Sequence, residues 1–186
     1  MQTIRSVFKC AVAALLLGVA VFSSAHAQNI ETEELLDKLR EPDLTNWEEV
    51  ENEIWKRWSE SGSPTADLLL ERGREAMAEE DWTTAIAHLT ALTDHAPDFA
   101  EGYNARATAY FQAGLYGPAM ADIARTLDLN PRHFGALMGL ALILEETGYT
   151  EDALSAYRAV AAIHPHRPNL KDAMGRLERQ LGDTRL

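Results

Sequence analysis

The feature that most constrains this chain is a repeat with a period of 34 residues. Prolines, alanines, small residues and large apolar residues each recur at this interval in a single register. The five columns are Pro97, Pro131 and Pro165; Ala85, Ala119 and Ala153; Gly73, Ala107 and Ala141; Leu69, Tyr103 and Leu137; and Leu89, Ile123 and Tyr157. A fixed period of this length is typical of stacked supersecondary units, so we expect a row of similar hairpins.

Each column has a physical explanation if one unit is a pair of antiparallel helices. Small residues allow the two helix axes to approach closely, whereas the large apolar residues fill the space between one hairpin and the next. A proline cannot continue a helix, so each proline is expected to end the second helix of its unit. Gly114 and Gly148 are expected in the turns inside the second and third units.

With these columns the chain resembles the tetratricopeptide repeat (TPR) family over residues 66–167. The matching positions are Leu69, Gly73, Ala76, Ala85, Leu89 and Pro97, then Tyr103, Ala107, Tyr110, Ala119, Ile123 and Pro131, then Leu137, Ala141, Leu144, Ala153, Tyr157 and Pro165. The resemblance implies an all-α, right-handed α-solenoid of three hairpins at residues 66–99, 100–133 and 134–167. Glu80 and Asp81 replace the usual turn glycine, and Arg72 and Arg106 stand where the family often has leucine. Arg106 is expected to pair with Asp122.

Helical segments are also expected at both ends of the repeats. Leu170, Ala173, Met174, Leu177 and Leu181 have helical spacing, which predicts a capping helix over residues 168–182. Residues 28–63 are acidic and contain two short helical patterns; carrying the register back by one period makes them a candidate degenerate fourth hairpin. Ser63 and Pro64 are expected to start the first repeat helix. In the N-terminal segment, Trp47 and Trp58 fit an apolar stripe, whereas Trp55 lies to one side and is a candidate exposed contact.

The first 27 residues have the pattern of a signal peptide. Arg5 and Lys9 precede an apolar stretch over residues 11–22, and Ala25-His26-Ala27 provides small residues for cleavage. This stretch is too short to span a bilayer, so no stable membrane anchor is expected after cleavage. Cys10 precedes the apolar stretch, which argues against a lipoprotein. We therefore expect an exported bacterial protein, periplasmic or secreted.

The remainder of the chain excludes several chemistries. It has no cysteine, so disulfides and thiolate zinc sites are absent after residue 27. Removing the two basic residues of the signal segment takes the formal net charge from −12 to −14. Such a charge opposes binding to nucleic acid or to an anionic membrane. The acidic run in residues 31–53 is interpreted first as a solvated helix face and second as an attraction for a basic partner.

The family resemblance implies a hollow face lined by the first helix of each hairpin. Positions on those helices outside the packing columns are the candidate partner-binding residues: Leu70, Arg74, Met77, Asn104, Thr108, Phe111, Met138, Leu142 and Glu145. This mixture of apolar and polar side chains suits a protein or peptide segment. A clamp for a C-terminal carboxylate is not expected, because Leu70 and Met138 occupy positions that would need polar or basic groups.

No enzyme motif, cofactor site or metal site is predicted. The chain has no glycine-rich phosphate loop, nucleophile elbow or His-Glu-x-x-His sequence. His133, His164 and His166 are interpreted as surface histidines of the turns, because two neighbouring histidines are a weak metal signal. The sequence favours a non-catalytic interaction module that holds a partner segment. The alternative is a structural subunit that assembles through its N-terminal or C-terminal helices.

Overall fold

The computed structural model describes residues 30–184, and within them all regular secondary structure is helical. The expected signal peptide lies outside this range. Residues 30–39 are helical, and eight further helices follow: α2 (Trp47–Trp58), α3 (Pro64–Ala78), α4 (Trp82–His95), α5 (Ala100–Gln112), α6 (Tyr116–Leu129), α7 (Phe134–Glu146), α8 (Thr150–Ile163) and α9 (Leu170–Thr184).

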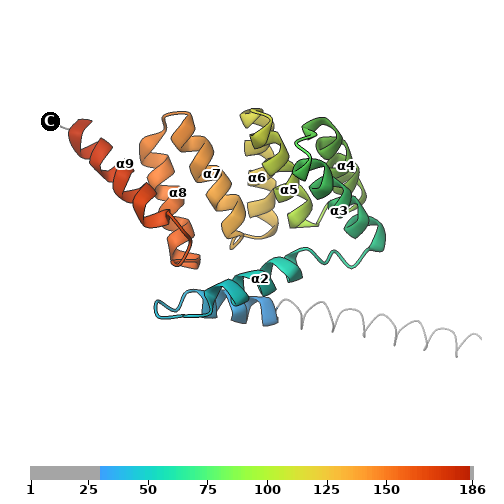
Figure 1. Ribbon diagram of the computed structural model, residues 1–186, viewed down its shortest axis with the longest axis horizontal. Helices are drawn as coiled ribbons and strands as arrows, with labels where there is room; N and C mark the ends of the chain where they lie inside the picture. The colour runs from blue at the N-terminus through green and yellow to red at the C-terminus, as the bar shows by residue number, and fades with distance from the viewer. Residues whose placement is uncertain (1–29, 185–186) are drawn as a thin grey trace, which may run out of the picture.

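Helices α3 to α8 form three antiparallel hairpins stacked in a row (Figure 1), which confirms the expected all-α solenoid. The small-residue columns lie where the paired helices meet: Ala85, Ala119 and Ala153 are all fully buried. At Gly73 a Cβ atom would lie 2.5 Å from Cγ of Leu89, so the first hairpin has no room there for any side chain. The size of these residues therefore sets the distance between the helices.

The turns obey local rules of helix termination. Helices α4, α6 and α8 end at His95, Leu129 and Ile163, each two residues before a proline of the repeat. Inside the second and third hairpins the turn residue is glycine with a positive φ, 73° at Gly114 and 83° at Gly148. The first hairpin has Glu80 at the same place with a φ of 59°, a conformation that is strained for a residue with a Cβ atom.

Side chains also mark where helices begin. Ser63 Oγ accepts a hydrogen bond from the Ala66 N–H, with Pro64 in the first turn of α3 as the sequence predicted. At the start of α4 the carboxylate of Asp81 accepts from the Thr84 N–H. These contacts satisfy backbone donors that a helix leaves free at its N-terminus.

The predicted contact between Arg106 and Asp122 is present and joins the two helices of the second hairpin. Nε and Nη2 of Arg106 donate to the two carboxylate oxygens of Asp122 at 2.7 and 2.8 Å. Nη1 donates to Thr93 Oγ1 at 2.7 Å, which extends the contact to the first hairpin. Arg106 thus links two neighbouring units, and the bidentate pair raises the pKa of its guanidinium.

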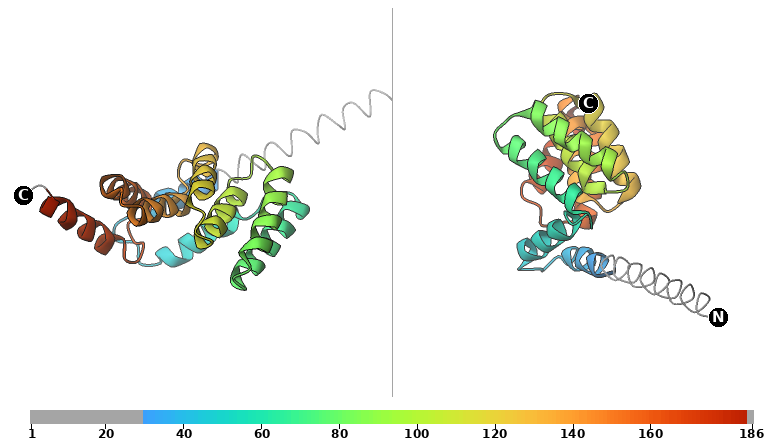
Figure 2. Two further views of the ribbon diagram at one scale, coloured as in Figure 1. Left: turned by 90° about the horizontal axis from the view of Figure 1, so that it is seen from above. Right: turned by 90° about the vertical axis from the view of Figure 1, so that its right-hand side faces the viewer.

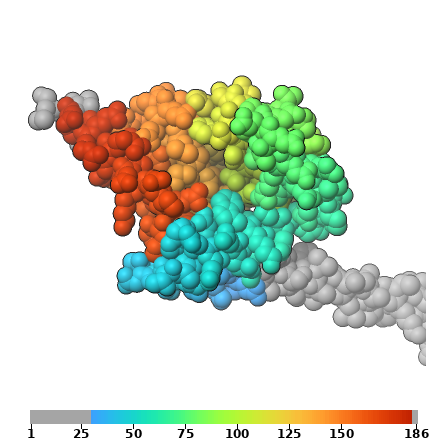
Figure 3. Space-filling model, in the orientation of Figure 1, coloured from blue at the N-terminus to red at the C-terminus, as the bar shows by residue number. Residues whose placement is uncertain are grey.

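The N-terminal helices do not continue the stack. We call residues 30–58 the strap, because the helix over residues 30–39 and α2 cross the ends of the hairpins along one edge of the array (Figures 1 and 3). Viewed from above, the hairpins follow a curved row and α2 lies on its inner side (Figure 2). The strap packs on Phe134 and Ile163, the first residue of α7 and the last of α8, which lie together at one end of the third hairpin. Its burial against these turns, and not on α3, replaces the fourth hairpin that the register suggested.

Tryptophans and ion pairs join the strap to the turns between hairpins. The rings of Trp58 and His133 stack with centroids 4.2 Å apart, and Trp47 stacks on His166 at 6.2 Å. Arg132 donates to Glu33 at 2.6 Å and to Asp37 at 2.8 Å. The strap therefore contacts the turn before α7 and the turn after α8.

The interpretation of His133 and His164 as surface residues was wrong. His133 and His164 are both 0% exposed, because the strap covers the turns that carry them. Trp55 is half-buried and packs its ring edge against His133 and Phe134. The sequence register could not reveal these contacts because the strap covers the hairpin ends, which a solenoid alone would leave exposed.

Helix α9 covers the end of the array. Leu170, Ala173 and Leu177 are buried against α8, and its other face is polar. Among residues 30–184, no helix combines the length and the apolar character that crossing a bilayer requires.

Candidate functional site

Two adjoining hollows on the inner face form one groove. The first has a volume of about 500 Å³ and lies between α7, α8 and α9; the second, of about 250 Å³, lies between α5, α7 and the strap. Both are lined by Met138, Leu142 and Arg167, so they adjoin. We call these two hollows together the groove.

The second hollow is mainly apolar. Its lining includes the large apolar residues Phe111, Ile123 and Ile143. It also includes the small residues Ala107 and Gly139, whose side chains do not fill the hollow. A volume of this size accommodates a large side chain of a partner, and the apolar lining favours an aliphatic or aromatic one.

One wall of this hollow comes from the strap. The Trp55 ring lies so close to the start of α7 that a Cβ atom at Gly135 would be 2.5 Å from Trp55 Cη2. Trp55 Nε1 donates to Glu51 at 3.2 Å, which fixes the orientation of the indole. The groove is therefore built jointly by the repeats and by the strap.

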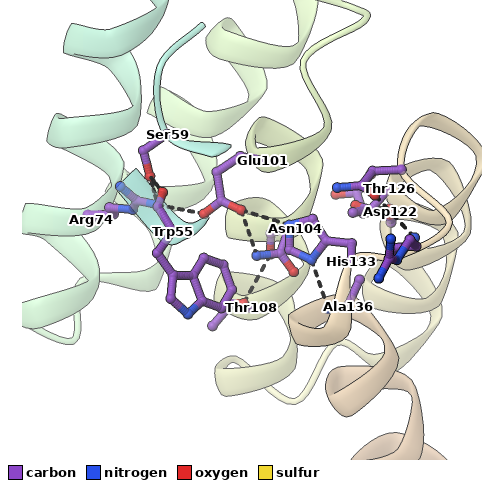
Figure 4. A network of polar contacts seen from close by, with 12 residues as sticks. Trp55, Ser59, Arg74, Glu101, Asn104, Thr108, Asp122, Thr126, His133 and Ala136 are labelled. Atoms are coloured by element: carbon purple, nitrogen blue, oxygen red, sulfur yellow. Dashed lines mark hydrogen bonds and ion pairs between the residues drawn. The ribbon is translucent and has the colours of Figure 1, made fainter. Parts of the chain in front are cut away.

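A buried carboxylate organises the polar end of the second hollow (Figure 4). Glu101 of α5 is 3% exposed and accepts from Arg74 Nη2 at 2.5 Å and from Asn104 Nδ2 at 3.0 Å. Its Oε2 also lies 3.1 Å from His133 Nε2. Three partners from three different segments thus compensate the cost of burying this charge.

The same network fixes the tautomer of His133 and the orientation of Asn104. His133 Nδ1 accepts from the Ala136 N–H at 3.2 Å at the start of α7, so Nε2 carries the proton that points to Glu101. Because the amide nitrogen of Asn104 donates to Glu101, its carbonyl oxygen is the group left to accept from a partner in the groove.

At the junction of the two hollows, Arg167 donates through Nη1 to Glu51 of the strap. His164 Nε2 lies 3.3 Å from the other carboxylate oxygen of Glu51. Burial by itself raises the pKa of the Glu51 carboxyl, but His164, the Trp55 N–H and Arg167 together outweigh it and hold the pKa below its ordinary value. Glu51 is therefore a stable anion that neutralises Arg167.

A similar group lies in the first hollow. Glu145 accepts from the Tyr157 hydroxyl at 2.7 Å and from Arg176 Nη2 at 2.6 Å. Burial tends to raise the pKa of Glu145, but Arg176 and the Tyr157 hydroxyl lower it overall; burial and the Glu145 charge also raise the pKa of Tyr157. The carboxylate of Glu145 and the guanidinium of Arg176 thus form a fixed ion pair in the wall of the groove.

The structure brings six of the nine predicted site residues together in the groove. They are Asn104, Thr108, Phe111, Met138, Leu142 and Glu145. The three from α3 do not line it: Leu70 is buried in the core, Arg74 is held by Glu101, and Met77 packs on the first hairpin. Leu70 as a partner contact was therefore a wrong prediction, because at this end of the array the side chain packs inward.

Sequence reasoning missed two groove residues outside the first helices, Arg167 of a turn and Arg176 of the capping helix. It gave Trp55 as a candidate contact but did not place it in the wall of the groove. Gly135 gave no signal either, since its role depends on Trp55, 80 positions earlier in the chain. Within residues 30–184, no three His, Cys, Asp or Glu side chains are placed to hold a metal ion.

Comparison with known proteins agrees with this architecture. The family model described as a tetratricopeptide repeat matches residues 70–128 and again residues 119–168. A TPR repeat-containing protein of Rhizobium etli is 35% identical over 150 residues, which are 81% of this chain and 72% of that protein. The human WD and tetratricopeptide repeats protein 1 is 30% identical over 118 residues, 61% of this chain but 17% of that protein.

Two solved structures have the same fold at low identity. The TPR domain of Sgt2 from Aspergillus fumigatus has a TM-score of 0.61 at 22% identity, covering 66% of this chain and 83% of that one. The first TPR of Spaghetti (RPAP3), bound to the HSP90 peptide SRMEEVD, has a TM-score of 0.62 at 22% identity, covering 64% of this chain and 95% of that one. With its repeats matched in sequence and in structure, this chain belongs to the tetratricopeptide repeat family.

Proposed function

We propose that this chain is an exported, non-catalytic adaptor that captures an extended segment of another protein of the cell envelope in the groove. The observation that carries the proposal is that the two hollows lie side by side and share Met138, Leu142 and Arg167. Together they offer an apolar pocket beside polar groups that are already oriented, as recognition of a peptide requires. A structural neighbour, the first TPR of RPAP3, holds a peptide in its own structure, which supports this use of the fold.

Order within the groove also favours binding. Glu101 fixes Asn104, Glu145 is held from two sides, and Trp55 is held by Glu51. Side chains that are already fixed lose little conformational entropy when a partner binds.

The alternative is a structural subunit that assembles through its N-terminal or C-terminal helices. In the N-terminal helices, Trp55 was the candidate contact for another copy; it is half-buried and packs within this chain against His133 and Phe134, which favours the adaptor. The exported location is supported by the sequence of residues 1–27. N-terminal sequencing of the protein purified from the producing cell tests this part: cleavage after Ala27 is expected, and an intact Met1 contradicts it.

Crosslinking in the native envelope, followed by mass spectrometry, tests the adaptor. Leu142→Glu places a charge in the groove, and Leu68→Glu makes the same change at an exposed leucine of α3 outside it. We expect Leu142→Glu to lose the crosslinked partner and Leu68→Glu to keep it, with equal helix content by circular dichroism. Equal capture by both variants would contradict binding in the groove.

A further inference from the structure

Every arginine at the groove or its polar end is already paired with a glutamate. Arg74 donates to Glu101, Arg167 to Glu51, and Arg176 to Glu145. The three pairs come from different parts of the fold, and one of the glutamates belongs to the strap. The cations at this face are therefore neutralised before any partner arrives.

A partner carboxylate gains little at such a place. An anion brought to Arg167 or Arg176 also approaches the glutamate bonded to the same guanidinium, so attraction and repulsion largely cancel. Glu146 adds a further carboxylate to the first hollow, where it accepts from the uncharged hydroxyl of Tyr116. The formal net charge of −12 over the whole chain acts in the same direction at longer range.

We infer that the groove selects a segment carrying a large apolar side chain next to lysine or arginine, and that it disfavours acidic tails. The apolar side chain fills the second hollow between Phe111, Ile123 and Gly139. The cation lies in the first hollow near Glu146, the carboxylate there whose hydrogen-bond partner, the Tyr116 hydroxyl, carries no charge. This inference rests on the proposed function and specifies the chemical class of its partner.

The strap sets this preference through Glu51. A TPR array without the strap would present Arg167 unpaired at the centre of the groove, where it could bind a carboxylate. With the strap in place, the Glu51 carboxylate forms an ion pair with the Arg167 guanidinium, and the Glu51 side chain is only 12% exposed. Glu51 is thus a specificity-determining residue that lies outside the repeats.

Selection from a random peptide library displayed on phage, using the purified protein as bait, tests the inference. We expect enriched sequences with an apolar residue beside lysine or arginine. Exchange of that basic residue for glutamate in the synthetic peptide should weaken binding roughly tenfold by fluorescence anisotropy at low salt. Enrichment of acidic sequences, or of free C-terminal carboxylates, would overturn the charge preference but leave groove binding standing.

Two matched pairs of variants locate the effect. Glu146→Gln should reduce the preference for the basic peptide severalfold, whereas Glu151→Gln, at the start of α8 outside the groove, should not. Glu51→Gln should raise affinity for the glutamate-exchanged peptide, whereas Glu48→Gln on the exposed side of the same helix should not. If the two variants of a pair changed peptide affinity equally, Glu146 or Glu51 would not be the residue that determines the charge preference. Absence of any enriched peptide, or enriched peptides that bind Leu142→Glu as well as the unaltered protein, would instead defeat the proposed function.

Discussion

Replacing Gly73 by alanine should destabilise the protein, although alanine is the better helix former. Gly73 lies in the middle of α3, and its missing Cβ atom would stand 2.5 Å from Cγ and 2.6 Å from Cδ2 of Leu89. Leu89 is 0% exposed, so it cannot move aside without displacing the atoms around it. The position thus tests whether close approach of the two helices determines the residue.

The expected magnitude follows from two opposing terms. Glycine to alanine inside a helix gains about 0.5–1 kcal/mol. Forcing an extra carbon into a filled core costs about 1–3 kcal/mol. We expect Gly73→Ala to lower the free energy of unfolding by about 1 kcal/mol, the difference between the middle values of these two terms. At Gly139 the nearest atom, Ile123 Cδ1, would lie at 3.4 Å, so Gly139→Ala should keep most of the helix gain.

Urea unfolding monitored by circular dichroism measures both changes. A second comparison uses Leu89→Ala, which should cost about 2–5 kcal/mol alone because it opens a cavity. In the double variant the new Cβ of residue 73 partly fills that cavity, so adding Gly73→Ala to Leu89→Ala should cost nothing further. If Gly73→Ala were as stable as Gly139→Ala, close packing would not explain the small residue at this position.

Three further predictions test other contacts. Asp122→Ala should lower the free energy of unfolding by about 3 kcal/mol, because it leaves the Arg106 guanidinium largely buried without its partner; the double variant Arg106→Met/Asp122→Leu should recover most of this loss in urea unfolding. Glu80→Gly should raise the free energy of unfolding by about 1 kcal/mol, because glycine adopts a φ of 59° without strain. Gly114→Ala should lower it by a similar amount. If the two variants had the same thermal unfolding midpoint, the backbone at these turns would not be strained for a residue with a Cβ atom. Glu51 and Glu145 have pKa values in the folded protein below their ordinary 4.5. Their contribution to the free energy of unfolding is therefore complete above pH 4.5 and is lost as the pH falls through the lower folded values. Urea midpoints measured by tryptophan fluorescence should report this loss of stability in acid, and Glu51→Gln should make the loss smaller.

The repeats were predictable from sequence because their packing is periodic. Ala85, Ala119 and Ala153 each face a partner helix inside their own hairpin. The need for a small residue at the close approach of two helices therefore recurs in each repeat. The pairing of Arg106 with Asp122 could be inferred for the same reason, since both residues lie inside one repeat. Local signals also predicted Ser63 as the cap of α3.

The position of the strap could not be predicted, because nothing periodic records it. Its contacts join residues far apart in the chain, such as Arg132 with Glu33 and Arg167 with Glu51. Such pairs leave no pattern in a single sequence. The register even favoured a different arrangement, in which these helices precede the first repeat.

Errors in the predicted site have the same origin. Leu70, Asn104 and Met138 occupy equivalent positions, yet Leu70 is buried in the core whereas Asn104 and Met138 line the groove. Equivalent positions meet different neighbours because the strap and α9 occupy one end of the array more than the other. Repeat symmetry therefore predicts which helix face is inward and cannot say which part of it is open.

The strap also restricts where a hairpin can be added to this protein or removed from it. Most solenoids gain or lose units freely, because every unit touches only the next one. Here Trp47 and Trp58 lie about 16 Å apart along α2 at 1.5 Å per residue. Trp58 meets the turn between the second and third hairpins, and Trp47 meets the turn between the third hairpin and α9. Inserting or deleting a hairpin between those turns would change the distance between them, so one of the two tryptophans would lose its contact with a turn. We therefore expect a hairpin to be gained or lost between those turns in evolution only if the length of α2 changes with it.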